Sequence, residues 1–284
     1  VIFIANSSVN FQALFNKLGL TNAPHPCALS QRLQIPMGTD LEAETHQGQT
    51  PLLMFVDVRG DDIEELKAFI ANNPSVNFDA VDSEGRTVLH YAADHGTEEL
   101  IGLLLSEGVS REAKDKSGMT PLLSCVKSRE EDEDNLTGPL GALIMAGAKQ
   151  DAVDNEGWTI LFHASATDKP QTLKMLLDMG IVNKDAQSAD GTTALFHGGP
   201  ATIRVLLQAG ANMSIHNNEG YTAQDKIMHR IDDGGPDDED LEFHSDCLAV
   251  FKKFSERRYA FAKIADEGFG MLWCRPEEAL ARCV

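Results

Sequence analysis

The sequence of 284 residues is poor in cysteine and in positive charge, and it lacks long apolar runs. Its five cysteines are odd in number, lie far apart and include no Cys-x-x-Cys pair (Cys27, Cys125, Cys247, Cys274 and Cys283). This pattern excludes a disulfide framework and a cysteine zinc site. We therefore expect reduced thiols and a cytoplasmic or nuclear compartment.

No apolar run approaches the ~20 residues that a membrane-spanning helix needs, so we expect no membrane insertion. The apolar start, Val1–Ala5, is too short for a signal peptide and no basic residue precedes it. Because the first residue is not Met, we expect the chain to have been cut from a longer one.

Catalytic motifs are also missing. The sequence contains no Gly-x-Ser-x-Gly, His-Glu-x-x-His, Gly-x-x-x-x-Gly-Lys or Gly-x-Gly-x-x-Gly. His244–Cys247 places three reactive residue types side by side, but adjacent helical residues do not face each other. We expect no enzyme, no cofactor and no metal. One alternative stays open, an unrecognised active site around Cys27 or Cys274.

Acidic residues dominate the charge, with 44 Asp and Glu against 24 Lys and Arg and a net charge of −20. Such a surface repels nucleic acid and anionic membranes and favours basic partners. Solubility alone is the other explanation of the excess. An acidic run, Ser128–Asn135, has no internal Gly and so does not fit a calcium loop. We expect a flexible loop there, because like charges repel each other.

An internal repeat organises the chain. Gly-x-Thr begins at Gly48, Gly85, Gly118, Gly157, Gly191 and Gly220, at spacings of 37, 33, 39, 34 and 29 residues. The stretch Gly85–Gly118 holds a helix start at Thr87–Ala93, a second apolar helix through Leu100–Leu105 and a stop at Gly108. A helix–turn–helix unit of this size cannot bury both apolar faces alone and must stack on copies of itself.

These residues resemble the ankyrin repeat, whose Thr-Pro-Leu-His-x-Ala signature is nearly intact at Thr87–Ala93. The resemblance implies an all-α solenoid of about six to seven helix–turn–helix repeats with β-hairpin-like loops and atypical helical caps. We expect a cap and degenerate first repeat over residues 1–47, repeats over 48–231, and an acidic linker and helical cap over 232–284. The resemblance also implies that His90 ties neighbouring repeats together.

Two repeats depart from the pattern. In the fifth, Gly198-Gly199-Pro200 cannot continue a helix, so we expect its first helix to be clipped. In the sixth, an acidic linker over Asp232–Asp240 precedes a helix in which Phe243, Leu248, Val250, Phe251 and Phe254 form the apolar face. Other repeats place Leu or Phe where the second has His90.

In the ankyrin family, partners bind the hairpin tips and the exposed side of each first helix. We expect the side chain between Gly and Thr to be exposed, Met119, Trp158 and Tyr221 above all, although Trp158 could instead fold back on its neighbour. The partner-binding residues carried over in this way are Arg86, Asp94, His95, Lys116, Met119, Glu156, Trp158, Thr192 and Tyr221.

The resulting hypothesis is a non-enzymatic, monomeric protein–protein interaction module or adaptor. It binds another protein or a peptide of basic character, and neither nucleic acid nor membrane. The alternative is a targeting or regulatory ankyrin domain of a larger enzyme, channel or host-directed effector.

Overall fold

A computed structural model describes residues 41–42, 44–59, 63–95, 97–128, 133–180, 182–232 and 238–266. Residues 1–40 of the expected N-terminal cap, which include Cys27, and residues 267–284 of the C-terminal tail, which include Cys274, lie outside these ranges. The chain forms two compact units with the boundary between Lys149 and Gln150, inside the expected repeat segment. The division into residues 1–47, 48–231 and 232–284 stays a prediction.

In the described ranges the elements are eleven α-helices and one 3-10 helix, and the only extended pairing is an isolated bridge between Val81 and Thr87. In the first unit the helices are α2 (Pro51–Arg59), α3 (Ile63–Asn72), α4 (Val88–His95), α5 (Glu98–Ser106), α6 (Pro121–Ser128) and α7 (Glu133–Met145). In the second they are α8 (Ile160–Ala166), α9 (Pro170–Asp178), η2 (Ala194–Phe196), α10 (Pro200–Gln208), α11 (Ala223–Asp232) and α12 (Asp238–Asp266).

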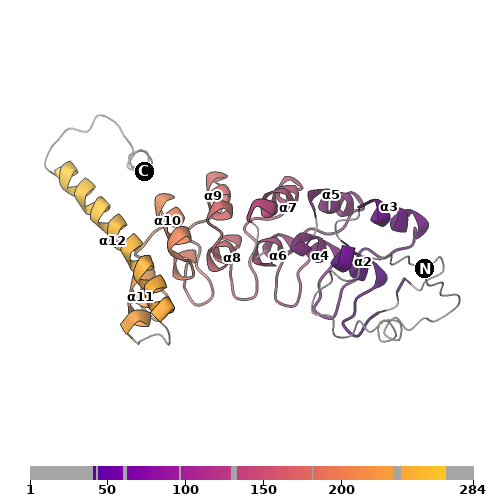
Figure 1. Cartoon of the computed structure of the whole chain (residues 1–284), viewed down its shortest axis with the longest axis horizontal. Helices are drawn as coiled ribbons and strands as arrows, with labels where there is room; N and C mark the ends of the chain where they lie inside the picture. The colour runs from indigo at the N-terminus through magenta and orange to yellow at the C-terminus, as the bar shows by residue number, and fades with distance from the viewer. Residues whose placement is uncertain are drawn as a thin grey trace. The chain divides into compact units, whose positions relative to one another are not determined.

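The first unit has two layers of helices. The first helices of successive repeats, α2, α4 and α6, pack side by side, and the second helices α5 and α7 pack beside each other in the other layer (Figure 1). Leu89, Leu104 and Leu123 are completely buried between the layers. Each amphipathic helix thus buries its apolar stripe against the next repeat, as the stacking argument predicted.

The acidic insert of the third repeat is shorter than expected. We predicted a loop through Asn135, but α7 already begins at Glu133. Acidic residues in a first helical turn are favoured by the helix dipole, which offsets their mutual repulsion. Residues 129–132 lie outside the described part of the chain.

The fifth repeat has a clipped first helix, as predicted. Only the three residues of η2 are helical, and α10 starts at Pro200 directly after Gly199. A Cβ on Gly198 would lie 2.6 Å from both the Ser165 and the Thr202 hydroxyl oxygens, so a side chain cannot fit. The glycine therefore both ends the helix and lets the neighbouring chain approach closely.

The last repeat pairs α11 with the 29-residue helix α12, which also packs on α10. Cys247, Phe251 and Phe254 are buried there, in agreement with the expected apolar face. Phe243 is an exception: its side chain is 45 % exposed, because it lies near the start of α12. The expected linker is also shorter, since α11 continues through Asp232 and α12 begins at Asp238.

In every described repeat except the fifth, a single side-chain oxygen closes the hairpin that precedes the first helix. Asp82 Oδ1 accepts hydrogen bonds from the backbone N–H groups of Glu84 and Arg86, both at 2.8 Å. The same pair of bonds is made by Thr45, Asp115, Asp154 and Asn217 in their own hairpins. In each hairpin the glycine three residues after this acceptor has a positive φ, between 71° and 87°.

Backbone hydrogen bonds join successive hairpins within each unit. In the first unit Ser83 N–H donates to Gln47 O and Lys116 N–H donates to Glu84 O, both at 2.8 Å. In the second, Ala189 N–H donates to Glu156 O at 3.0 Å and Asn218 N–H donates to Asp190 O at 2.9 Å. The hairpins of a unit therefore form a continuous, hydrogen-bonded edge.

We predict that Gly191→Ala lowers the free energy of unfolding by more than Gly220→Ala. Both positions have positive φ, which costs a side chain about 1–2 kcal/mol. A Cβ on Gly191 would also meet Asn218 N at 2.9 Å, whereas nothing lies within 4 Å of the Gly220 position. Urea unfolding of the two variants measures the difference, and equal losses would show that hairpin contact does not restrict Gly191.

Candidate functional site

The candidate site is the surface that the hairpins and first helices form in each unit, which we call the hairpin face. It includes the side chain between Gly and Thr of each repeat, Gln49, Arg86, Met119, Trp158, Thr192 and Tyr221. Three of these are buried, with exposed fractions of 8 % for Gln49, 3 % for Met119 and 6 % for Thr192. The expected exposure of Met119 is therefore wrong.

Arg86, Trp158 and Tyr221 are half-buried. Arg86, Trp158 and Tyr221 therefore reach solvent, while Gln49, Met119 and Thr192 do not. Among the other predicted residues, His95, Lys116 and Glu156 are exposed, whereas Asp94 is 9 % exposed and belongs to the buried set.

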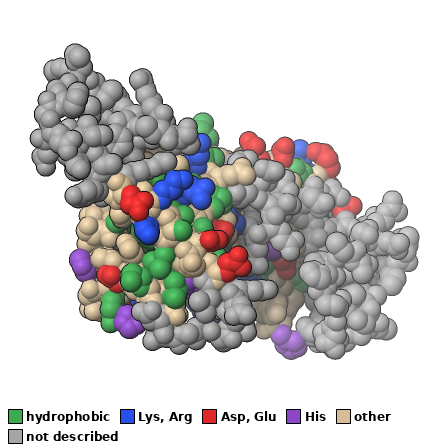
Figure 2. Space-filling model, turned by 60° about the vertical axis from the view of Figure 1, so that its left-hand side comes forward, with side chains coloured by type: hydrophobic (Ala, Val, Ile, Leu, Met, Phe, Trp, Pro, Cys, Tyr) green, Lys and Arg blue, Asp and Glu red, His purple; other side chains and the backbone are tan. Residues whose placement is uncertain are grey.

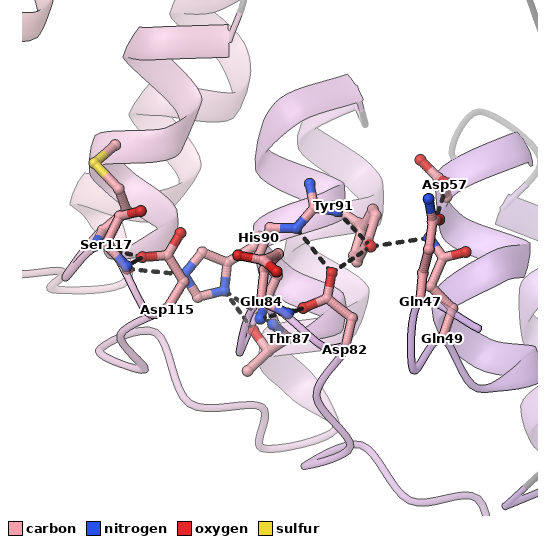
Figure 3. A network of polar contacts seen from close by, with 12 residues as sticks. Gln47, Gln49, Asp57, Asp82, Glu84, Thr87, His90, Tyr91, Asp115 and Ser117 are labelled. Carbon is pink, nitrogen blue, oxygen red and sulfur yellow. Dashed lines mark hydrogen bonds and ion pairs between the residues drawn. The ribbon is translucent and has the colours of Figure 1, made fainter. Parts of the chain in front are cut away.

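In the first unit the hairpin face is held by a polar network around Tyr91 (Figure 3). The Tyr91 hydroxyl donates to Asp82 Oδ2 at 2.8 Å and accepts from the Arg86 guanidinium at 2.8 Å. Arg86 Nε donates to Asp82 Oδ2 at 2.9 Å, and the guanidinium carbon lies 4.4 Å from the centre of the Tyr91 ring. The guanidinium is thus fixed by an ion pair, a hydrogen bond and a cation–π contact.

Electrostatics favour the charged forms in this network. Burial alone would raise the pKa of Asp82, but hydrogen bonds from the Arg86 backbone, the Tyr91 hydroxyl and the guanidinium outweigh it and lower the pKa. Burial alone would lower the pKa of Arg86, but Tyr91, Asp82 and Asp94 raise it. Burial also raises the pKa of Tyr91, so this hydroxyl stays protonated and can donate.

The network reaches the preceding repeat through Gln49. Its side-chain amide donates to the Tyr91 hydroxyl at 2.9 Å and to Asp57 Oδ2 at 3.2 Å (Figure 3). Asp57 lies on α2 and Tyr91 on α4, so the amide links the first helices of two repeats. Gln49 was expected to be exposed at a hairpin tip, and its buried amide instead links the two repeats.

His90 joins the second repeat to the third, as the family resemblance implied. The Thr87 backbone N–H donates to His90 Nδ1 at 3.1 Å, which places the ring proton on Nε2. Nε2 in turn lies 3.0 Å from Met119 O and donates to it. The ring is completely buried, and burial lowers the pKa of His90 although the Met119 carbonyl, Asp115 and Asp94 act in the opposite direction.

Repeats without this histidine lose the polar link. Where the first and fourth repeats have Leu53 and Phe162, the preceding hydroxyls Thr50 Oγ1 and Thr159 Oγ1 are buried and have no hydrogen-bond partner among the described residues. Thr50 therefore makes no capping hydrogen bond with the described residues, although Pro51 begins α2. The apolar residues pack in place of the hydrogen bonds, since Leu53 is 0 % and Phe162 1 % exposed.

In the second unit Trp158 is the centre of an aromatic cluster. Its ring lies 4.6 Å from His197, 5.4 Å from His163 and 5.7 Å from Phe162, measured between ring centres. Trp158 thus does contact the next repeat through His197, and it remains half-exposed. His163 Nε2 lies 3.1 Å from Asp154 Oδ2.

A spacing of nine residues relates the two clusters and was overlooked in the sequence. It separates the hairpin acceptor from a first-helix side chain in Asp82 to Tyr91 and in Asp154 to His163, and in the fifth repeat it separates Ser188 from His197, which directly follows η2. The first two pairs are in direct contact, and His197 reaches Thr192 of its own hairpin, with Nε2 at 3.0 Å from Oγ1. This recurring spacing could have identified Tyr91, His163 and His197 before the structure.

Other chemistry is scarce in the described residues. Cys125 and Cys247 are buried, and burial raises the pKa of the Cys247 thiol to about 11, which suppresses thiolate reactivity. Across the described ranges, no three His, Cys, Asp or Glu side chains gather closely enough to hold a metal ion. None of the described helices combines the length and apolar character needed to cross a membrane.

We predict that Tyr91→Phe lowers the free energy of unfolding by about 1–3 kcal/mol, because it removes a partner from the buried Asp82 carboxylate. Tyr221→Phe is the matched control, since the Tyr221 hydroxyl makes no hydrogen bond with the described residues and should be lost at little cost. Denaturant unfolding of both variants provides the measurement. Similar losses from the two would contradict the importance of the network.

A further prediction concerns the free energy of unfolding at acidic pH. Because the pKa of His90 is below the ordinary 6.5, the unfolded chain binds a proton before the folded chain does. The contribution of neutral His90 to the free energy of unfolding is therefore complete above about pH 6.5. It falls as the pH is lowered, and the free energy of unfolding then changes by at most about 1.4 kcal/mol per pH unit for one proton. His197, whose pKa burial also lowers, adds to it.

His90→Leu should reduce this pH dependence between about pH 6.5 and 5, as well as lowering overall stability. Free energies of unfolding measured at several pH values separate the pH dependence of the stability from its overall magnitude. An unchanged pH dependence in the His90 variant would show that this histidine titrates alike in both states.

Comparison with known proteins agrees with this architecture. The family model of ankyrin repeats (3 copies) matches residues 25–115 and 53–134. An ankyrin repeat protein of variola virus is 32 % identical over 155 residues, covering 51 % of this chain and 27 % of the viral protein. The NF-kappa-B inhibitor delta of Mus musculus is 29 % identical over 236 residues, covering 72 % of this chain and 69 % of its own length.

A solved structure is similar as well. It is a chain in the complex of the Bd0816 predatory endopeptidase from Bdellovibrio bacteriovorus with the immunity protein Bd3460, with a TM-score of 0.53 and 27 % identity. The match covers 72 % of this chain and 98 % of that one. The repeated hairpins, the paired helices and these similarities show that the chain is built from ankyrin repeats.

Proposed function

We propose that the chain is a non-enzymatic binding module that holds a partner protein or peptide on its hairpin face. The observation that carries the proposal is the presence of Arg86, Trp158 and Tyr221, all half-exposed, at the same position of three repeats. Arg, Trp and Tyr are the residue types that dominate binding energy at protein interfaces. Their common position makes this a property of the repeat surface and not of three unrelated sites.

The three side chains are also held in place before any partner arrives. The Arg86 side chain remains 34 % exposed while Asp82 and Tyr91 fix its guanidinium. Trp158 packs on His197, and Tyr221 makes an edge contact with His229 at 5.2 Å. Preorganised side chains lose little conformational entropy on binding, which favours affinity.

The net charge supports a partner of basic character. Acidic side chains are interspersed with basic and apolar ones among the coloured residues on the face shown in Figure 2. The chain has 44 acidic and only 24 basic residues, so its charges together produce a negative electrostatic potential. This potential speeds the encounter with a cationic partner. Specificity has to come from individual positions on the hairpin face.

The similar proteins support a second candidate, in which the partner is an enzyme that the chain holds inactive. One of them is named an NF-kappa-B inhibitor, and the enzyme as partner rests on the other, which comes from a complex of an endopeptidase with an immunity protein. The chain covers only 27 % of the length of the variola virus protein. A targeting or regulatory role inside a larger protein is therefore a further form of the same binding function.

The test is affinity capture from a cell lysate with the wild-type chain and an Arg86→Ala, Tyr221→Ala double variant. Each anchor should cost about 2 kcal/mol when truncated, so a partner held by wild type should be lost. The control is Met145→Ala, Met179→Ala, which removes side chains that are 87 % and 43 % exposed at the ends of the second helices α7 and α9. Circular dichroism establishes that all three chains are folded.

Retention of the partner by the first variant, with loss by the methionine variant, would place binding outside the hairpin face. For the enzyme-directed form of the proposal, the captured partner is assayed for activity with and without the wild-type chain. Unchanged activity would exclude inhibition and leave the adaptor role.

A further inference from the structure

In the sixth repeat, the side chain of Lys226 pairs with two residues of the hairpin. Lys226 Nζ lies 2.7 Å from Glu219 Oε2 and 5.7 Å from the centre of the Tyr221 ring. The carboxylate precedes the hairpin glycine, the aromatic ring follows it, and the cation comes from the first turn of α11. An ion pair and a cation–π contact thus converge on one ammonium group.

The fourth repeat has the same hairpin. Asp154 Oδ1 accepts from the N–H groups of Glu156 and Trp158, both at 2.9 Å, as Asn217 Oδ1 does from Glu219 and Tyr221 at 3.1 and 2.9 Å. The two hairpin glycines have φ values of 79° and 87°. Glu156 and Trp158 therefore occupy the places that Glu219 and Tyr221 occupy in the sixth repeat.

The fourth repeat has no lysine at the position that corresponds to Lys226. The position of Lys226 is taken by His163, which lies against Asp154 Oδ2 instead. The Glu156 carboxylate is exposed and has no partner among the described residues, and the same holds for the indole N–H of Trp158. A carboxylate and the aromatic ring that favours cations most are thus left without a positive charge.

Other repeats do not offer this combination. In the second, Arg86 itself lies over the Tyr91 ring and pairs with Asp82, which is an internal example of the same chemistry. In the fifth, the carboxylate of Asp190 is engaged by the hydroxyls of Ser188 and Thr192, and no aromatic follows the glycine. Within the described repeats, the acidic and aromatic pair without its own cation is confined to the fourth.

We propose that Glu156 and Trp158 receive a Lys or Arg side chain of the partner. The proposal rests on the binding function proposed above and names the chemistry of one contact. The partner's cation would take the place that Lys226 holds in the sixth repeat, paired with Glu156 and against the open part of the Trp158 ring. An Arg would add planar stacking and hydrogen bonds to the carboxylate.

The probe is an acetylated and amidated Gly-Arg-Gly-Arg-Gly peptide, titrated into the full chain by calorimetry at about 0.15 M salt, where long-range attraction is screened. Trp158→Leu and Glu156→Gln should each weaken binding roughly five- to tenfold. Glu84→Gln is the matched control, because Glu84 precedes the glycine of the second repeat and is equally exposed, but Arg86 follows it. This variant should bind within about twofold of wild type.

Glu156→Lys supplies a charge of the opposite sign at an exposed position that cannot affect folding much, and it should abolish binding of the peptide. Equal weakening by Glu84→Gln and Glu156→Gln would show a general charge effect and overturn the proposal. So would unchanged binding by Trp158→Leu, or the absence of peptide binding by wild type. In these cases partner capture that depends on Arg86 and Tyr221 would still stand, so the two proposals fail separately.

Discussion

The hydrogen bonds from one side-chain oxygen to two backbone N–H groups determine the geometry of every hairpin described except the fifth. Asp82, Asp115 and Asp154 each close the turn in this way, and the following glycine adopts the positive φ that the turn requires. Because the turn is satisfied locally, the backbone edge is free to bond to the next hairpin. Repeat stacking and the position of the hairpin face both depend on this arrangement.

The fifth repeat shows how far that arrangement can vary. Ser188 replaces the acid at the bend, and Asp190 supplies the carboxylate that accepts from Thr192 N–H at 3.2 Å. Hydrogen bonds from Ser188 and Thr192 outweigh the effect of burial and lower the pKa of Asp190. The hairpin keeps its backbone bonds to both neighbours although its first helix is reduced to η2.

Variation at two positions then gives each repeat its own chemistry on a common backbone. In the second repeat, Arg86 and Tyr91 build a closed network with Asp82. In the fourth, Trp158 and His163 leave an aromatic ring and the Glu156 carboxylate open to solvent. A solenoid can thus carry one repeat whose polar groups pair internally and another whose carboxylate stays exposed, because the hairpin backbone does not depend on which residues fill these positions.

The sequence by itself determined the repeat period, the glycine turns, the clipped fifth helix and the structural role of His90, because each follows from local backbone rules or from a motif. It predicted too long an acidic loop before α7, since charge repulsion was weighed without the helix dipole. Only the tertiary structure decided which side chains of the hairpin face reach solvent. Met119 is buried while Trp158 and Tyr221 remain half-exposed, and this depends on what the adjoining hairpins and helices place beside each side chain.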